Sequence, residues 1–89
     1  MKESLLQLGK ILKSKLLDSN IEFNDISIDS RNIKDKNLFI AIKGEKFDGH
    51  EFISEAINNG CSAIITEKKI DNIPQLIVTD TTLALAKIA

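Results

Sequence analysis

The sequence has little of several residue types that define common classes of protein. Its 89 residues include no tryptophan or tyrosine, four phenylalanines, one proline, one histidine and one cysteine, Cys61. A single cysteine excludes an internal disulfide, so a chain of this size must fold on its apolar core. The 12 basic and 13 acidic side chains form no lysine or arginine tract, which argues against a nucleic-acid partner.

Long apolar stretches are also missing. Lysines interrupt the first twenty residues, so no segment there resembles a signal peptide or a membrane span. We therefore expect a cytoplasmic protein that has no membrane partner. The length and the 43% content of hydrophobic residues predict one domain over residues 1–89.

Hydrophobic periodicity predicts an α/β domain, in which a small sheet, mixed or parallel, has flanking helices. Ser4 and Gln7 fit a capping box at the start of the first helix. Asp80 can cap the last helix, which meets no stop signal before Ala89, so we expect that helix to be truncated and the chain to be a piece of a longer protein. The patterns predict helices over residues 5–16, 49–59 and 80–89, and strands over residues 26–29, 38–42, 63–66 and 76–78.

The continuous apolar run over residues 38–42 is typical of a strand covered on both faces, and we place it at the centre of the sheet. The strand, helix and strand over residues 38–66 should form a parallel, right-handed crossover. Ligands of such sheets bind beyond the carboxyl ends of the strands. In this chain those ends carry the segments 29–31 and 43–50.

The first of these segments offers a candidate anion site. Arg31 can present a planar fork of donors to a phosphate or carboxylate, and Ser30 adds a hydroxyl. The alternative is a surface arginine that pairs with Asp29 or Asp35. Spacing alone leaves both interpretations open.

The second segment has Gly44 and Gly49 at the glycine spacing of a phosphate-binding P-loop, but His50 and Glu51 follow where lysine and serine or threonine are needed. This mismatch excludes an ATP site of that kind. The glycines can equally serve a turn that needs positive φ. Asp48 and Glu51 also fit a capping box, and a capping carboxylate would discourage a phosphate there.

The remaining candidate residues, Phe47, His50 and Cys61, do not form a catalytic pattern. Phe47 can stack on a planar base or fold back onto the core. His50 has no partners at ligand spacing, so we expect no metal site, and Cys61 is most simply a buried small hydrophobe. We expect no catalytic residues.

Four motifs in a fixed order strongly resemble the N-terminal domain of the Mur ligases, the ATP-dependent enzymes that extend the peptide of the peptidoglycan precursor. The motifs are Asp29-Ser30-Arg31, the segment from Leu38 to Glu45, the segment from Phe47 to Ile53, and the segment from Ala56 to Ala63. The sequence departs from the family at two places: Lys36-Asn37 stands where a glycine and an aspartate are common, and Cys61 replaces a usual alanine. Both departures should affect packing more than binding.

The resemblance implies that this domain binds the UDP moiety of a UDP-N-acetylmuramoyl-peptide. Arg31 and Ser30 would face the diphosphate or the adjacent ribose, and the backbone of residues 44–46, with Phe47 beside it, would contact uracil. The substrate-binding residues that the resemblance implies are Ser30, Arg31, Gly44, Glu45, Lys46, Phe47, Asp48, Gly49 and His50.

The resemblance also implies a full-length enzyme that uses ATP and Mg²⁺ in a central ATPase domain of the same chain, while these 89 residues hold no cofactor and do not catalyse. Residues 78–85 look most like the member that adds D-alanyl-D-alanine to the tripeptide precursor. The alternatives are the sister ligase that adds the third peptide residue, a stand-alone interaction module, and a small independent enzyme that uses Asp48, His50 and Arg31.

Overall fold

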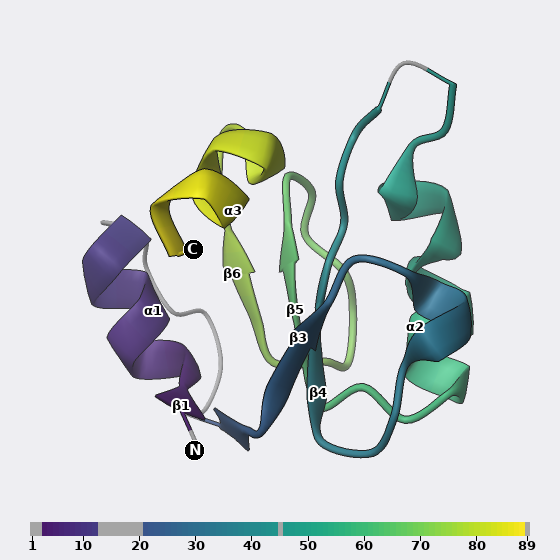
Figure 1. The fold of residues 1–89 in the computed structure, drawn as a ribbon, viewed down its shortest axis with the longest axis horizontal. Helices are drawn as coiled ribbons and strands as arrows, with labels where there is room; N and C mark the ends of the chain where they lie inside the picture. The colour runs from purple at the N-terminus through teal and green to yellow at the C-terminus, as the bar shows by residue number, and fades with distance from the viewer. Residues whose placement is uncertain (1–2, 13–20, 45, 89) are drawn as a thin grey trace.

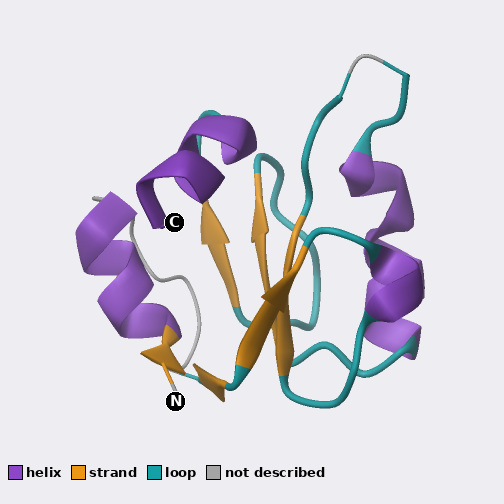
Figure 2. Cartoon of the chain, viewed as in Figure 1, coloured by secondary structure: helices purple, strands orange, loops and turns teal. Residues whose placement is uncertain are grey.

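The computed structural model describes residues 3–12, 21–44 and 46–88 (Figures 1 and 2). Glu45, Ala89 and the expected continuation of the first helix to Leu16 lie outside these residues. The main sheet has the strand order β3 (Asp25–Ser27), β4 (Asn37–Ile40), β5 (Ala63–Thr66) and β6 (Gln75–Ile77). The helices are α1 (Leu5–Leu12), α2 (Ile53–Asn58) and α3 (Thr81–Ile88), and the 3-10 helices are η1 (Ser30–Asn32) and η2 (Gly49–Phe52).

The four strands of this sheet are parallel to one another, which confirms the α/β class and selects the parallel form of the sheet. Leu38 and Ile40 of β4 belong to a hydrophobic cluster that α1 and α3 cover, whereas Phe39 belongs to a second cluster under α2. Figure 1 shows α1 and α3 on one side of the sheet and α2 on the other. Every residue of β4 is buried, so the prediction of a central strand covered on both faces is confirmed.

The helix ends follow the sequence signals. The Ser4 Oγ accepts from the Gln7 N–H at 3.3 Å, and the Gln7 side chain accepts from the Ser4 N–H at 3.4 Å, so the predicted capping box is present. The Asp80 carboxylate accepts from the Leu83 N–H at 3.1 Å and caps α3 as expected. Gly60 follows α2 with a φ of 106°, the left-handed conformation that favours glycine at the end of a helix.

The strand predicted over residues 38–42 is β4, which ends at Ile40, and the strand predicted over residues 76–78 is β6, which ends at Ile77. Two further predicted elements also differ in extent. The first strand ends at Ser27, because the Ser27 hydroxyl bonds both the N–H and the carbonyl of Asp29 and turns the chain. Ile28, which was predicted to lie in this strand, therefore leaves the sheet and is 54% exposed. The predicted helix over residues 49–59 begins as η2 and becomes α-helical only at Ile53, and Phe52 is partly exposed.

A second, two-stranded antiparallel sheet pairs β1 (Glu3–Ser4) with β2 (Glu22–Phe23) beneath α1. Strands of two residues carry no periodicity, and the sequence therefore did not predict them. Phe23 of β2 is buried in the cluster that α1 and α3 cover. This small sheet anchors the start of the chain to the main core.

The two departures from the family pattern lie in the core or in a turn. Cys61 is buried beside α2, and burial raises the pKa of its thiol to about 11, as suits the small hydrophobe that we expected. Lys36 has a φ of 64°, the left-handed conformation that glycine adopts without strain. The buried Asn37 supports this turn, since its side-chain oxygen accepts from the Lys34 N–H at 2.9 Å.

Ile65→Val should lower the free energy of unfolding by about 1 kcal/mol, because Ile65 is fully buried in β5 and loses a packed methylene. The same change at Ile11, which is 54% exposed on α1, should stay within about 0.5 kcal/mol of the parent chain. Urea denaturation of the two variants measures both values. Equal decreases in the free energy of unfolding for the two variants would contradict the assignment of Ile65 to the core and of Ile11 to the surface.

Candidate functional site

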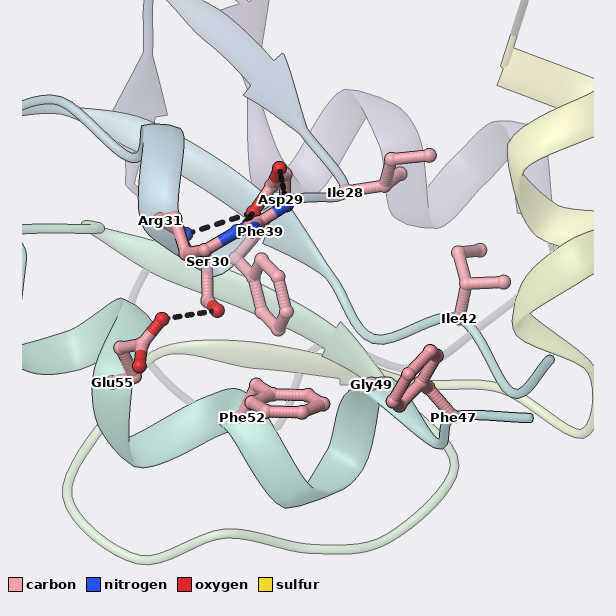
Figure 3. Close-up of a pocket in the computed structure, with 10 residues that line it drawn as sticks. All are labelled: Ile28, Asp29, Ser30, Arg31, Phe39, Ile42, Phe47, Gly49, Phe52 and Glu55. Atoms are coloured by element: carbon pink, nitrogen blue, oxygen red, sulfur yellow. Dashed lines mark hydrogen bonds and ion pairs between the residues drawn. The ribbon is translucent and has the colours of Figure 1, made fainter.

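A pocket of about 580 Å³ opens beyond the carboxyl ends of β3 and β4 (Figure 3). Four of the predicted binding residues line it: Ser30, Arg31, Phe47 and Gly49. Six further residues complete the lining: Ile28, Asp29, Phe39, Ile42, Phe52 and Glu55. The pocket therefore joins the two segments in which the sequence predicted ligand binding.

The other predicted binding residues do not line the pocket. Gly44, Lys46, Asp48 and His50 belong to the loop that forms one side of it, and Glu45 lies outside the described residues. Phe52 and Glu55 line the pocket although the sequence did not indicate either as a binding residue. Glu55 reaches the pocket through its hydrogen bond to Ser30, a contact between α2 and η1 that no local sequence pattern signals.

Aromatic rings dominate the apolar side of the pocket. Three of the chain's four phenylalanines line it, namely Phe39, Phe47 and Phe52. Phe39 is buried beneath the pocket, whereas Phe47 is 70% exposed, so the alternative that Phe47 folds back onto the core is wrong. Exposed rings beside a concave site can stack on a planar ligand.

Arg31 lies at the polar end of the pocket and pairs with Asp29. The Arg31 Nε and Nη2 donate to the two carboxylate oxygens of Asp29, each at 3.1 Å, so the predicted surface pair with Asp29 is present. These hydrogen bonds hold the pKa of Asp29 below its usual range and raise the pKa of Arg31. The pair uses two of the five N–H donors of the guanidinium, which leaves three for a ligand.

Ser30 is buried and held from two directions. Its Oγ donates to the Glu55 carboxylate at 2.7 Å, and its backbone carbonyl accepts from the Asn59 side chain at 2.8 Å. The Asp29 carboxylate accepts from the Arg31 N–H at 2.9 Å and caps η1, which fixes the backbone through Ser30. The serine hydroxyl is thus a fixed part of the polar end.

The loop from Gly44 to Gly49 folds back toward the end of β4. Its glycines are needed for close packing of the backbone and not for a left-handed conformation. The Gly49 N–H donates to the Ile42 carbonyl at 2.7 Å, and a Cβ on Gly49 would stand 2.7 Å from the Ile42 nitrogen. The Gly44 N–H donates to the Phe47 carbonyl at 2.8 Å across the same loop. Neither glycine has positive φ, so that alternative is wrong, and Gly49 is needed for close backbone approach.

His50 fastens this loop to the next strand. Its ring is 7% exposed, its Nδ1 lies 2.6 Å from Asp48 Oδ1, and its Nε2 accepts from the Glu67 N–H at 2.8 Å. Because Nε2 accepts, we assign the proton to Nδ1, which then donates to the carboxylate. Both ring nitrogens are used within the protein, so the geometry favours a positioning role for His50.

Asp48 caps η2 through His50 and not through Glu51 as the capping box predicted. Its carboxylate accepts from the His50 N–H at 3.0 Å in addition to the ring contact. These two hydrogen bonds hold the pKa of Asp48 below its ordinary value. Asp48 thus places a carboxylate at the start of η2, and His50 and Glu51 stand where a P-loop needs lysine and serine or threonine, so this loop does not fit ATP and Mg²⁺.

Within the described residues, no group of three or more histidine, cysteine, aspartate or glutamate side chains could hold a metal ion. Over the same parts of the chain, every helix is too short or too polar to cross a membrane. The pocket itself offers aromatic faces, one guanidinium and several fixed hydrogen-bonding groups.

Comparison with known proteins gives consistent matches. Residues 22–88 match the model described as "Mur ligase family, catalytic domain". The chain is 39% identical to a UDP-N-acetylmuramoyl-tripeptide--D-alanyl-D-alanine ligase of Haemophilus influenzae over 100% of this chain and 20% of the relative. It is 45% identical to a UDP-N-acetylmuramoyl-L-alanyl-D-glutamate--2,6-diaminopimelate ligase of Listeria monocytogenes over 82% of this chain and 15% of the relative.

A solved structure has the same fold. The crystal structure of MurF from Acinetobacter baumannii superposes with a TM-score of 0.89 at 35% identity, covering 99% of this chain and 20% of that one. The chain thus spans about a fifth of the length of the first curated relatives that it matches.

Asp48→Asn should destabilise the chain near neutral pH and have little effect in acid. A carboxyl with a depressed pKa contributes stability above its unfolded value of 3.8, and the contribution disappears as the pH falls through the folded value. Thermal melts from about pH 7 to about pH 3 should show the difference in Tm between parent and variant closing at the acid end. Asp71→Asn, at an exposed position, is the control. A difference that stays constant across this range would contradict the assigned cap.

Proposed function

The chain belongs to the Mur ligase family, and on that premise we propose that its pocket binds the UDP moiety of a UDP-N-acetylmuramoyl-peptide. The observation that carries the proposal is the gathering of three of four phenylalanines in one pocket whose far end holds Arg31. Aromatic faces suit uracil, and the three guanidinium donors that Asp29 leaves free suit a diphosphate.

The location of the pocket also supports the proposal. It opens beyond the carboxyl ends of adjacent parallel strands, where ligands of such sheets bind. The loop that carries Phe47 offers backbone groups near its turn, and Gly49 lets this loop approach β4 closely. We propose direct contacts from Ser30, Arg31 and Phe47, with the backbone of residues 44–46 facing uracil. In this proposal Asp48 and His50 hold the loop.

For the whole protein we propose a cytoplasmic ligase of peptidoglycan synthesis that adds D-alanyl-D-alanine to the UDP-N-acetylmuramoyl-tripeptide. ATP and Mg²⁺ would bind a central ATPase domain of the same protein, since the described residues supply no fitting site. The match to the Haemophilus relative covers the whole chain, whereas the match to the Listeria relative covers 82% of it. This difference in coverage favours the dipeptide-adding enzyme over its sister.

An amide NMR titration of the chain with UDP, and then with the UDP-N-acetylmuramoyl-tripeptide, tests the binding proposal. We expect shifts confined to Ser30, Arg31, residues 44–50 and the neighbouring Phe52 and Glu55. Pyrophosphate is the control ligand and should bind far more weakly, because it lacks the base that stacks. A folded chain that shows no shifts in these segments at about 10 mM UDP would contradict the proposal.

Variants of Phe47 sharpen the same test. Phe47→Leu should weaken UDP binding about tenfold, since it removes the exposed aromatic face and keeps an apolar side chain. Phe47→Trp keeps a stacking surface and should bind within about twofold of the parent chain. Equal binding by all three chains would place the base away from Phe47.

These 89 residues alone should not catalyse. Mixed with ATP, Mg²⁺, the tripeptide precursor and D-alanyl-D-alanine, the chain should release no more phosphate than a protein-free control. Turnover that disappears in Arg31→Ala would instead support a small independent enzyme. If UDP leaves the folded chain unperturbed and no turnover occurs, a stand-alone interaction module becomes the better interpretation.

A further inference from the structure

The hydrogen bonding at the polar end of the pocket fixes which groups there can donate and which can accept. A carboxylate only accepts hydrogen bonds, so the 2.7 Å contact between Ser30 Oγ and Glu55 Oε1 directs the hydroxyl proton toward Glu55. The lone pairs of Ser30 Oγ are then left to accept. Figure 3 shows this hydroxyl and the Glu55 carboxylate side by side at the edge of the pocket.

The neighbouring carboxylate is already engaged. Asp29 Oδ1 accepts from the backbone and side chain of Arg31, and Oδ2 accepts from Arg31 and from the Asn32 side chain. Glu55 Oε2 has no such set of partners among the described residues. The Ser30 hydroxyl and the Glu55 carboxylate therefore form a pair of acceptors, which we name the acceptor pair.

Two neighbouring hydrogen-bond acceptors favour a ligand group that donates hydrogen bonds. Phosphate oxygens carry negative charge and accept hydrogen bonds, so a diphosphate placed against Glu55 would meet like charge and no donor. A ribose diol is neutral and presents two O–H donors on adjacent carbons. We propose, on the basis of the proposed function, that Ser30 and Glu55 bind the ribose hydroxyls of the nucleotide and that Glu55 determines specificity for ribose.

The layout of the pocket agrees with this assignment. In Figure 3, Phe47 and Gly49 lie at one end, Ser30, Arg31 and Glu55 lie at the other, and Phe52 lies between them. Uracil at the Phe47 end places the ribose near the acceptor pair, and the diphosphate then continues toward the free donors of Arg31. Ser30 thus contacts ribose, and Arg31 alone contacts the diphosphate.

Binding of nucleotide analogues to the chain, measured by calorimetry, tests the inference. The 2′,3′-dideoxy analogue of UDP should bind at least about tenfold more weakly than UDP, because it lacks both donors to the acceptor pair. The 5-methyluracil analogue keeps the ribose hydroxyls and the imide N–H, and it should bind within about twofold of UDP. A tenfold loss with the methyl analogue and none with the dideoxy analogue would overturn the inference.

Two variants assign the effect to Glu55. Glu55→Ala removes the carboxylate and frees the Ser30 hydroxyl to rotate, so the preference for UDP over its dideoxy analogue should shrink to about twofold. Glu51→Gln, an exposed change on η2 outside the pocket lining, should keep the full preference. Amide spectra establish that each variant is folded.

The outcomes separate the inference from the proposed function. Binding of UDP at the pocket with no preference over the dideoxy analogue would overturn the ribose assignment and leave UDP binding intact. A preference that survives Glu55→Ala would overturn the role of Glu55. Failure of every nucleotide to bind the folded chain would overturn both proposals together.

Discussion

The close approach of Gly49 to Ile42 determines the geometry of the site. A backbone hydrogen bond of 2.7 Å joins these residues, and any side chain at Gly49 would collide with the backbone of Ile42. This contact turns the chain immediately after the buried strand β4, so Phe47 lies over the pocket and Asp48 is in place to begin η2. His50 then reaches the Glu67 N–H beyond β5. The rigid sheet thereby fixes the position of an otherwise exposed loop.

Most of the charged and titratable groups around the pocket are already engaged in hydrogen bonds within the protein. The carboxylates of Asp29 and Asp48 act as caps, and the hydrogen bonds that they accept lower the pKa of each. The His50 ring is sequestered between two protein partners, and the buried thiol of Cys61 has a raised pKa. What remains available to a ligand is an aromatic surface, part of one guanidinium and the acceptor pair. Such a set of groups suits the binding and orientation of a ligand, as the proposed function requires.

Much of the fold could be predicted because strong local patterns and tertiary packing agree. The apolar run of β4, the capping box at Ser4 and the cap at Asp80 each have one physical interpretation, and all three are present in the structure. The end of β3 could not be predicted, since the Ser27 hydroxyl competes with the sheet for the backbone of Asp29. The sequence indicated the two segments of the site, residues 29–31 and 43–50, but not Phe52 and Glu55, which also line the pocket. Glu55 enters the pocket only because the crossover brings α2 against η1, a long-range contact that no local pattern encodes.

In the proposed complex, uracil lies against Phe47 at the carboxyl end of β4. Intermolecular nuclear Overhauser effects in the complex of the isotope-labelled chain with UDP test this most directly. We expect contacts from the H5 and H6 protons of uracil to the ring protons of Phe47, together with contacts from ribose protons to Ser30. Contacts from uracil to residues of α1 or α3, on the opposite face of the sheet, would contradict this placement.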